Sequence, residues 1–366
     1  MQEIIKVNYE EKPCYEIIIN DSFLQLSKCI KNLGYSKRRI AIITDSNVNP
    51  LYGMQIKNLL SEVSDNIIIH EFSAGENYKN LETVYGIYED LIKHHFDRKD
   101  LLIALGGGVV GDITGFCAST YLRGIGFIQI PTTLLAQTDS SVGGKTGVDY
   151  KGYKNMVGAF YMPKLVYINI NVLKTLDARQ FASGFAEVMK YGLIMDNDFY
   201  TWLIDNIYEI NDRDSQAIAY LIMKSCEFKK KIVEQDPKEQ GIRAILNFGH
   251  TIGHAIEKYK DFKLLHGECV ALGCVAAAII SNKKGLIDTD TCYEIRDMFV
   301  PFGLPITVDD IDIDKIYELM KSDKKADSGK IRFILLKDLG NAYVDSTVTE
   351  KEIKDALNEL CLDEAE

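Results

Sequence analysis

The stretch Leu101–Gly115 reads LLIALGGGVVGDITG and is the strongest indication of the fold class in this sequence. Five apolar residues of the buried-strand type run directly into glycines, and the pattern Gly106-x-Gly108-x-x-Gly111 then opens a helix. Glycines at such a turn let backbone N–H groups approach a pyrophosphate without a Cβ in the way. The stretch therefore predicts a phosphate site at the turn, although a tight strand-to-helix turn without a ligand would have the same pattern.

This turn departs from the usual dinucleotide fingerprint in two respects. It follows a strand about 100 residues into the chain instead of the first strand, and no acidic residue follows it by about 20 residues to bind a ribose. Asp45, which ends an earlier apolar run, is a candidate ribose partner instead.

Strand and helix patterns alternate on both sides of the turn. Short β-branched or apolar runs at 39–44, 67–72, 127–130 and 166–170 predict strands, and an apolar stripe at helical spacing predicts a helix over 81–92. Such alternation is typical of a Rossmann-like parallel sheet with helices on both faces. After about residue 177, long helical patterns follow at 196–210, 214–235, 249–260 and 268–284, with a small strand at 331–336 and a last helix near 350–361.

We therefore expect an α/β domain over residues 1–177 and a mainly α-helical domain over residues 178–366. The length of 366 residues suits two domains. Clefts between domains are common ligand sites, so we expect the active site there.

Composition excludes several classes of partner. A formal net charge of -11 gives no general attraction to nucleic acid or to an anionic membrane. No stretch approaches the roughly 20 apolar residues of a membrane span, and the first residues do not resemble a signal peptide. Eight scattered cysteines without a C-x-x-C pair indicate reduced thiols, so we expect a cytoplasmic protein.

Three of the six histidines lie close together in the sequence. His250 and His254 are four residues apart and share one helix face, and His266 follows in LLHGE. Imidazole suits zinc and similar ions, and Glu187 interrupts an apolar helical stretch where a carboxylate ligand could lie. The pattern favours a metal site over histidines buried as hydrogen-bonding groups, but spacing alone leaves open which histidines bind the ion.

A second polar run covers residues 131–160, PTTLLAQTDSSVGGKTGVDYKGYKNMVGAF. It places Asp139, Lys145, Lys154 and Asn155 among many small residues, which indicates a pocket floor that binds hydroxyls, a carboxylate or a phosphate. A solvated loop is the alternative. Further polar groups near the histidine segment are Lys229, Arg243 and Asn247.

Together these segments resemble the 3-dehydroquinate synthase family from about Asp45 to Leu336. The joint order and spacing of many long motifs carry the resemblance. The motifs are SAGENYK (73–79), GGGVVGD (106–112), YLRG (121–124), PTTLLAQTDSSVGGKTGVD (131–149), KNMVGAF (154–160), AEVMKYGLI (186–194), RAILNFGHTIGHAIE (243–257), LHGE (265–268) and SDKK (322–325).

The resemblance implies an enzyme of the shikimate pathway, which leads to the aromatic amino acids. The implied substrate is the sugar-acid phosphate 3-deoxy-D-arabino-heptulosonate 7-phosphate, and the products are 3-dehydroquinate and phosphate. The implied steps are oxidation at C5, β-elimination of phosphate, reduction at C5, ring opening and an intramolecular aldol closure. The implied cofactors are NAD, which is not consumed, and a zinc or cobalt ion, and the implied assembly is a homodimer.

The resemblance also assigns roles to individual residues. The implied metal ligands are Glu187, His250 and His266. The implied NAD set is Asp45, Asn47, Glu76, Lys79, Gly107, Gly108, Val109, Asp112, Thr132, Thr133, Lys145, Lys154 and Thr175. The implied substrate set is Asp139, Lys145, Asn155, Lys229, Arg243, Asn247, His254 and one of Lys324 or Lys325. Arg123 matches an arginine that reaches the neighbouring subunit's substrate phosphate.

Three alternatives stay open at this point. Other sugar-phosphate cyclases share the fold and mechanism, although SVGGKTGVD and LNFGH are the versions seen in dehydroquinate synthases, and aminodehydroquinate synthase differs little at these positions. Iron-type alcohol and glycerol dehydrogenases also combine a glycine turn with H-x-x-x-H, but they would release reduced NAD. A non-catalytic NAD-binding sensor would have no need for the Glu187, His250 and His266 set.

Overall fold

A computed structural model describes residues 2–323 and 331–361 of the chain. It divides into two compact units, of which the first contains Met1–Leu176 and Ile218–Lys238 and the second contains Asp177–Ala217 and Glu239–Glu366. The expected α/β class is confirmed. Helix α8 (Ser215–Gln235) belongs mostly to the first unit, whereas the sequence patterns placed all of 178–366 in one helical domain.

The first unit is built on a sheet of seven strands. Its strands, in spatial order, are β1 (Gln2–Tyr9), β2 (Lys12–Asn20), β9 (Leu165–Asn169), β6 (Gly126–Pro131), β5 (Leu101–Gly106), β3 (Ile40–Asp45) and β4 (Ile67–Phe72). The β1–β2 pair is antiparallel, and every other neighbouring pair is parallel. The five strands expected from the apolar runs at 39–44, 67–72, 101–105, 127–130 and 166–170 are therefore present, and the N-terminal hairpin is an addition that the sequence patterns did not indicate.

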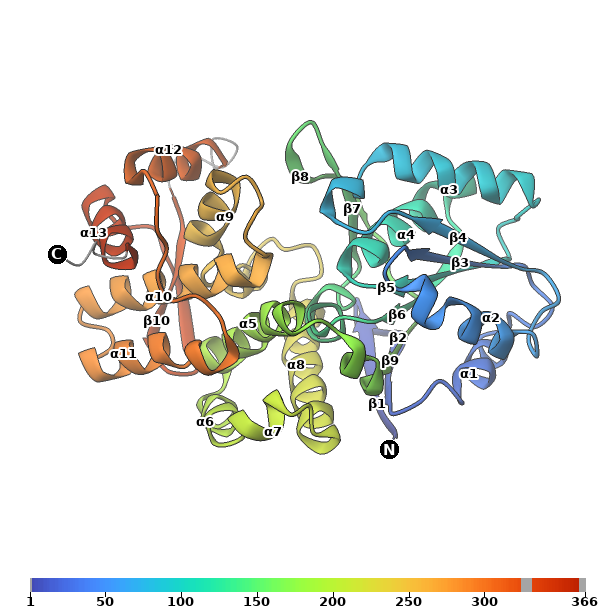
Figure 1. The fold of residues 1–366 in the computed structure, drawn as a ribbon, viewed down its shortest axis with the longest axis horizontal. Coiled ribbons are helices and arrows are strands. Elements are labelled where there is room, and N and C mark those ends of the chain that lie inside the picture. The colour runs from blue at the N-terminus through green and yellow to red at the C-terminus, as the bar shows by residue number, and fades with distance from the viewer. Residues whose placement is uncertain (1, 324–330, 362–366) are drawn as a thin grey trace. The chain divides into compact units, whose positions relative to one another are not determined.

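Both faces of this sheet are covered by helices (Figure 1). Alternation along β3 shows how: Ile40 and Ile42 pack with α1 (Leu26–Asn32) and α2 (Met54–Leu60). Ala41 and Ile43 pack with α3 (Leu81–Lys93) and α4 (Gly108–Thr120) on the opposite face. Because side chains alternate along a strand, a continuous apolar run supplies both cores at once.

The order of the strands reverses next to β3. The chain leaves β3 on one side to form β4, then crosses to the other side to form β5 and continues to β6. In open α/β sheets, ligands bind at the carboxyl ends of the strands where this reversal occurs. Here those ends are Asp45 of β3 and Gly106 of β5, so the topology places a ligand crevice at the glycine turn.

The polar run 131–160 forms a second hairpin of β7 (Lys145–Tyr150) and β8 (Tyr153–Phe160) in place of an irregular loop. Its small residues have a structural use, since a Cβ on Gly147 would lie 2.9 Å from the carbonyl oxygen of Val157 on the paired strand. The register shifts between Val148 and Tyr150, so the hairpin is irregular at Asp149. Short one-turn helices occupy 49–53, 76–78, 121–123, 136–140 and 170–175 of this unit.

The second unit is mainly helical and is built around α10 (His266–Lys283). Every residue of α10 from Gly267 to Ser281 is buried, as expected for a helix that is apolar on all sides. It packs against several of its neighbours. The other elements are α5 (Ala178–Met195), α6 (Asn197–Asp205), α7 (Ile207–Asn211), α9 (His250–Tyr259), α11 (Thr289–Asp297), α12 (Ile313–Asp323), α13 (Glu350–Leu360), the strands β10 (Phe333–Asp338) and β11 (Asn341–Asp345), and two short turns of helix, at 242–247 and 300–302.

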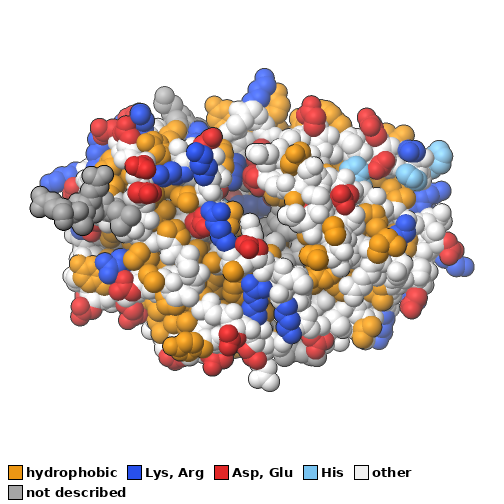
Figure 2. Space-filling model, viewed as in Figure 1, with side chains coloured by type: hydrophobic (Ala, Val, Ile, Leu, Met, Phe, Trp, Pro, Cys, Tyr) orange, Lys and Arg blue, Asp and Glu red, His pale blue; other side chains and the backbone are white. Residues whose placement is uncertain are grey.

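Charged side chains of both signs are interspersed over the face shown in Figure 2, with hydrophobic side chains in small groups between them. Although the net charge is -11, the acidic side chains on this face are intermixed with basic ones. None of the helices in the described part of the chain has the length and apolar character needed to cross a bilayer.

Glycines bring the backbones of α9 and α10 into contact, and this contact can be tested. A Cβ on Gly273 would collide with the carbonyl oxygen of Gly249, so Gly273→Ala should lower the free energy of unfolding by about 1–3 kcal/mol. Gly86 lies inside α3, and a Cβ there would only make ordinary contact with His70, so Gly86→Ala is a matched control that should stabilise by about 0.5–1 kcal/mol. Chemical denaturation measures both, and shifts of the same sign would contradict the packing described.

Candidate metal centre and dinucleotide site

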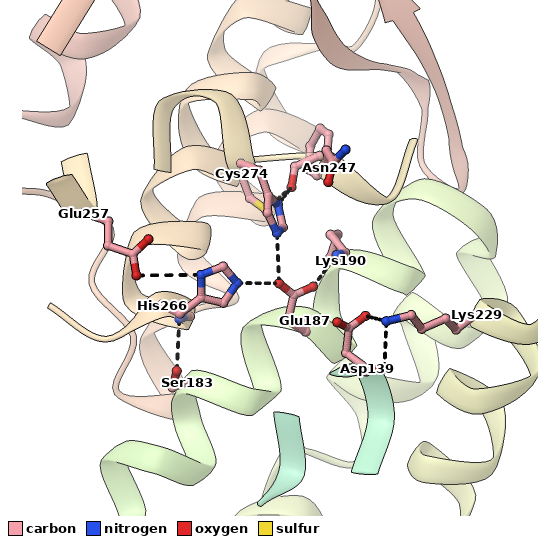
Figure 3. Close-up of polar contacts among 12 residues, drawn as sticks. Asp139, Ser183, Glu187, Lys190, Lys229, Asn247, Glu257, His266 and Cys274 are labelled. Atoms are coloured by element: carbon pink, nitrogen blue, oxygen red, sulfur yellow. Dashed lines mark hydrogen bonds and ion pairs between the residues drawn. The ribbon is translucent and has the colours of Figure 1, made fainter. Parts of the chain in front are cut away.

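Three potential metal ligands converge in the second unit (Figure 3). Oε1 of Glu187 lies 3.3 Å from Nε2 of His250 and 3.2 Å from Nε2 of His266. The three ligand atoms all lie within 4.8 Å of one another, although they come from three different helices. Glu187 is only 1% exposed, so the centre is closed on the side of the carboxylate.

The first turn of α10 is anchored to α5, and this anchor places His266 beside Glu187. The Ser183 hydroxyl accepts a hydrogen bond from the Gly267 amide at 3.0 Å, and a Cβ on Gly267 would collide with the Ser183 carbonyl oxygen. Ser183 and Glu187 are four residues apart on α5 and therefore share one face of that helix. Arg179 adds a bidentate ion pair with Glu268, at 2.6 and 2.8 Å.

The close packing of α9 against α10 brings in His250. Gly249 has a φ of +78° and begins α9, and its Cβ would lie 2.7 Å from the Cys274 sulfur on α10. The Nδ1–H of His250 can donate to the carbonyl oxygen of Phe248 at 3.0 Å. This bond places the lone pair on Nε2, which faces Glu187, and a metal requires that tautomer.

The electrostatics of the centre suit a cation. Burial favours the neutral carboxyl group, but the ammonium of Lys190 and the two imidazoles hold the pKa of Glu187 well below its usual range. Lys190 is 2% exposed and forms an ion pair with Oε2 of Glu187 one turn away on α5. Burial would lower the pKa of His266, but the hydrogen bond with Glu187 and the nearby carboxylate of Glu257 outweigh it and raise that pKa to about 9.

The residues fit a zinc or cobalt ion. With ligands about 2.0–2.1 Å from a tetrahedral zinc, two ligand atoms lie about 3.3 Å apart. The two measured separations, 3.2 and 3.3 Å, agree with this value. Two imidazoles and one carboxylate are also a ligand set that catalytic zinc uses, with a position left for substrate. A second possible group, formed by His254, Glu257 and His266, overlaps the first because it shares His266.

The glycine turn in the first unit has the geometry of a phosphate site. Gly107 and Gly108 lie at the N-terminus of α4, where backbone N–H groups and the helix dipole favour an anion. A Cβ on Gly107 would lie 3.0 Å from Cγ2 of Thr133, and the Thr132 amide donates to the Gly106 carbonyl oxygen at 2.9 Å. The three glycines at 106–108 and the two threonines at 132–133 therefore lie together around one turn at the end of β5.

The glycines of this segment have two different uses. A Cβ on Gly111 would lie 2.7 Å from Oε1 of Gln129, and one on Gly115 would collide with Thr146, so both glycines serve close packing of α4. Gly106 is similar, because its Cβ would collide with Val110. Gly107 and Gly108 are also closely packed, since Cβ atoms there would lie 3.0 Å from Thr133 and 3.1 Å from Ser140, but they lie at the N-terminus of α4, where a helix favours an anion.

Asp45 lies at the end of β3 next to this turn in the sheet. Its Oδ1 accepts the amides of Asn47 at 2.9 Å and Val48 at 3.0 Å, which fixes the orientation of the carboxylate. Thr175 is held by a different neighbour, the hydroxyl of Tyr52 at 2.6 Å. Val109 lies in the first turn of α4.

A network around Lys79 joins the glycine helix to the β7–β8 hairpin. Lys79 is only 5% exposed. Its ammonium group contacts Oδ2 of Asp112 and donates to Oδ1 of Asn155, both at 2.6 Å. Burial disfavours the ammonium, but the charges of Asp112 and Glu76 more than offset it and raise the pKa of Lys79. Lys154 lies 3.5 Å from the Glu76 carboxylate. The structure thus brings four residues of the implied NAD set together with Asn155 of the implied substrate set.

The remaining expected residues are placed separately. In the first unit, Lys229 on α8 contacts Oδ1 of Asp139 at 2.8 Å, so this lysine is not on a solvated helix face. Lys145 is exposed at the start of β7. In the second unit, Arg243 is fully buried, and Asn247 donates to Glu239 at 3.3 Å. His254 is exposed on α9, and Lys324 and Lys325 lie outside the described residues.

Arg123 lies on an exposed and strained turn. Leu122 and Arg123 have φ values of +50° and +67°, and Gly124 follows at +129°. Two consecutive non-glycine residues in this region cost free energy that the surrounding structure must offset. Arg98 contributes by donating to the Leu122 carbonyl oxygen at 2.8 Å. The Arg123 side chain is exposed on the first unit.

Sequence reasoning missed three residues of these sites: Lys190, Glu257 and Asp149. Lys190 could have been found, because it is a second charge three residues after Glu187 in an apolar helix. Asp149, whose Oδ1 accepts the Asn155 amide at 2.8 Å, gave no signal beyond its place in a polar run.

Comparison with solved structures defines the class of protein. A 2-epi-5-epi-valiolone synthase from Streptomyces hygroscopicus subsp. jinggangensis, solved with NAD+ and Zn2+ bound, superposes with a TM-score of 0.89 at 26% identity, covering 97% of this chain and 99% of that one. A 2-deoxy-scyllo-inosose synthase complexed with carbaglucose-6-phosphate, NAD+ and Co2+ superposes with a TM-score of 0.87 at 26% identity, covering 98% of this chain and 100% of that one. An NADH-dependent butanol dehydrogenase from Thermotoga maritima superposes with a TM-score of 0.71 at 16% identity, covering 98% of this chain and 99% of that one. This likeness shows the fold alone. The fold is therefore that of the sugar phosphate cyclases.

Sequence comparison then gives the family. Residues 69–183 match the family model described as 3-dehydroquinate synthase N-terminal, and residues 184–326 match 3-dehydroquinate synthase C-terminal. A 3-dehydroquinate synthase from Acetivibrio thermocellus is 44% identical over 95% of this chain and 96% of its own length. A 3-dehydroquinate synthase from Ruminiclostridium cellulolyticum is 43% identical over 97% of this chain and 98% of its own length. The chain belongs to the 3-dehydroquinate synthase family, which catalyses a step of the shikimate pathway.

The raised pKa of His266 predicts that metal binding releases a proton. In the metal-free protein this imidazole is protonated below about pH 9, and an ion bound at Nε2 must displace that proton. Calorimetric titration with zinc near neutral pH, in buffers of different ionisation enthalpy, should show release of about one proton from His266. The release should fall as the pH rises through 9. Binding heats that do not depend on the buffer would contradict this prediction.

Proposed function

We propose that this chain converts 3-deoxy-D-arabino-heptulosonate 7-phosphate to 3-dehydroquinate and phosphate, with NAD and a zinc or cobalt ion as cofactors. The observation that carries the proposal is the convergence of Glu187, His250 and His266 at ligand distances, in a chain that shares 44% identity with a 3-dehydroquinate synthase over nearly its whole length. A sensor without catalytic function would have no use for a buried carboxylate held ionised between two imidazoles.

Each cofactor has a set of residues that suits it. Glu187, His250 and His266 would hold the metal ion, and the glycine turn with Asp45, Asn47, Glu76, Lys79, Asp112, Thr132, Thr133, Lys154 and Thr175 would hold NAD. When bound, the ion lowers the pKa of a coordinated hydroxyl, and NAD takes up a hydride and returns it.

The chain's own residues would orient the substrate and hold its charge. In an acidic protein a phosphate must be bound by local donors, and we propose Lys145, Asn155, His254 and Arg123 for this role. A phosphate dianion can accept the neighbouring C6 proton, so these residues need to hold it in place and need not act as the base. Asp139, Lys229, Arg243, Asn247 and one of Lys324 or Lys325 would bind the hydroxyls and carboxylate of the substrate.

The assembly and location belong to the same proposal. We propose a homodimer in which Arg123 reaches the substrate phosphate of the partner subunit, and the strained, exposed turn that carries Arg123 supports this role. None of the eight cysteines, all of which lie in the described part of the chain, forms a disulfide, and this agrees with a reducing compartment, for which we propose the cytoplasm.

One assay tests the function. The purified protein, given the heptulosonate phosphate, catalytic NAD and zinc, should release phosphate and form 3-dehydroquinate without net formation of NADH. A chelator should abolish phosphate release, and added zinc should restore it. Stoichiometric NADH would indicate a dehydrogenase instead, and absence of phosphate release with both cofactors bound would exclude the proposed reaction.

Lys145 provides a sharper test within the assay. Lys145→Ala removes a cation proposed to bind the phosphate, so kcat should fall by about 100-fold or more. NAD binding, followed by fluorescence quenching, should change far less than kcat, because the other residues of the proposed NAD set would still hold the dinucleotide. Lys151→Ala, at the exposed tip of the same hairpin, is the matched control and should retain wild-type kcat. Near-normal kcat in the Lys145 variant would mean that this lysine does not bind the phosphate.

A further inference from the structure

Glu257 is a buried carboxylate beside the metal centre that none of the roles above uses. It lies on α9, is only 3% exposed, and its Oε1 lies 3.9 Å from Nδ1 of His266 (Figure 3). Burial of a carboxylate costs free energy unless it is paired, so its position against this imidazole calls for an explanation.

The two ring nitrogens of His266 face different carboxylates. Nε2 faces Oε1 of Glu187 at 3.2 Å, and Nδ1 faces Glu257. An imidazole that binds a metal through one nitrogen carries its proton on the other, and that N–H almost always meets a carboxylate, a carbonyl oxygen or water. His250 meets this requirement through the Phe248 carbonyl oxygen, and Glu257 occupies the corresponding position for His266.

We propose that Glu257 is a positioning residue, which accepts the Nδ1–H of His266 and thereby directs the Nε2 lone pair at the metal ion. The inference rests on the metal centre of the proposed function. Glu257 lies one turn beyond His254 and two turns beyond His250 on α9, so one helix supplies a ligand and the support for a ligand on α10. The glycine backbones of α9 and α10 lie close together, which brings Glu257 near His266.

The overlapping group of His254, Glu257 and His266 gives the competing arrangement. In it, Glu257 would itself bind the ion, and His266 would bind through Nδ1. The pairing of Nε2 of His266 with Glu187 and the Nδ1–H tautomer of His250, which leaves its Nε2 lone pair toward Glu187, favour the arrangement in which Glu257 supports His266 without binding the ion. The two arrangements predict opposite nitrogens of His266 on the metal.

The experiment compares three variants of the full-length protein. Glu257→Met keeps much of the side-chain volume but removes the acceptor, whereas Glu257→Gln keeps an acceptor oxygen and removes the charge. Asp261→Asn, an exposed carboxylate just after α9, is the matched control. Zinc affinity is measured by competition with a chromophoric chelator, and circular dichroism verifies that each variant is folded.

NMR of zinc-loaded protein with 15N-labelled histidine reports the chemistry directly, because the chain has only six histidines. Wild-type His266 should show Nε2 on the metal and a slowly exchanging Nδ1–H. In Glu257→Met this proton should exchange rapidly and zinc affinity should fall by about 10–100-fold. Glu257→Gln should retain the protected Nδ1–H and lose less affinity, and Asp261→Asn should match wild type.

Three results would overturn the inference. One is unchanged zinc affinity and an unchanged Nδ1–H in Glu257→Met. Another is an equal loss of affinity in the Met and Gln variants with the Nδ1–H unaffected, which would indicate a general charge or packing effect. The third is zinc bound to Nδ1 of His266. Each leaves the proposed function standing if wild-type protein releases phosphate, whereas a wild-type protein that binds no zinc would remove the proposed function itself.

Discussion

The buried carboxylate of Glu187 is the constraint on which the second unit depends. An ionised carboxylate taken out of water is costly unless opposite charges and hydrogen-bond donors surround it. Lys190 supplies one cation from the same helix, and His250 and His266 supply imidazoles from two others. This arrangement requires three helices to approach one another closely. The glycine contacts of α10 with α5 and α9 make that approach possible.

Much of the fold was predictable because its signals are local. The apolar runs at 39–44, 67–72 and 101–105 correspond to strands of the sheet, and the long helical patterns after residue 177 correspond to helices. The affiliation of α8 was not predictable, since it depends on tertiary contacts of residues 218–238 with the first unit. The β7–β8 hairpin was missed because its glycines and lysines resemble a loop, whereas backbone-to-backbone pairing at Gly147 is what requires them.

The candidate sites likewise combine residues that a local sequence pattern indicates with residues that depend on tertiary contacts. Spacing along α9 indicated a metal site but could not distinguish His254 from His266 as a ligand, because the choice depends on where α10 begins relative to α5. The family resemblance supplied the set Glu187, His250 and His266, and these side chains lie together in the structure. The roles of the individual NAD and substrate residues stay predictions. Glu257 contacts His266 across two helices, and such a contact leaves no periodic pattern in a sequence, whereas Lys190 pairs with Glu187 within α5.

Within a chain of net charge -11, local charge pairing fixes the positions of cations that belong to the proposed ligand sites. Lys79 lies between Asp112, Glu76 and Asn155, and Lys229 is paired with Asp139, so these cations are held in place by acids before any ligand arrives. Such pairing reduces the cation's own desolvation cost and fixes its position, but it also weakens its attraction for a second anion. A site built this way selects ligands by geometry more than by net attraction, because only an anion that reaches several paired donors together can compete with their internal partners. The net negative charge of the chain then disfavours anions that cannot make all of those contacts.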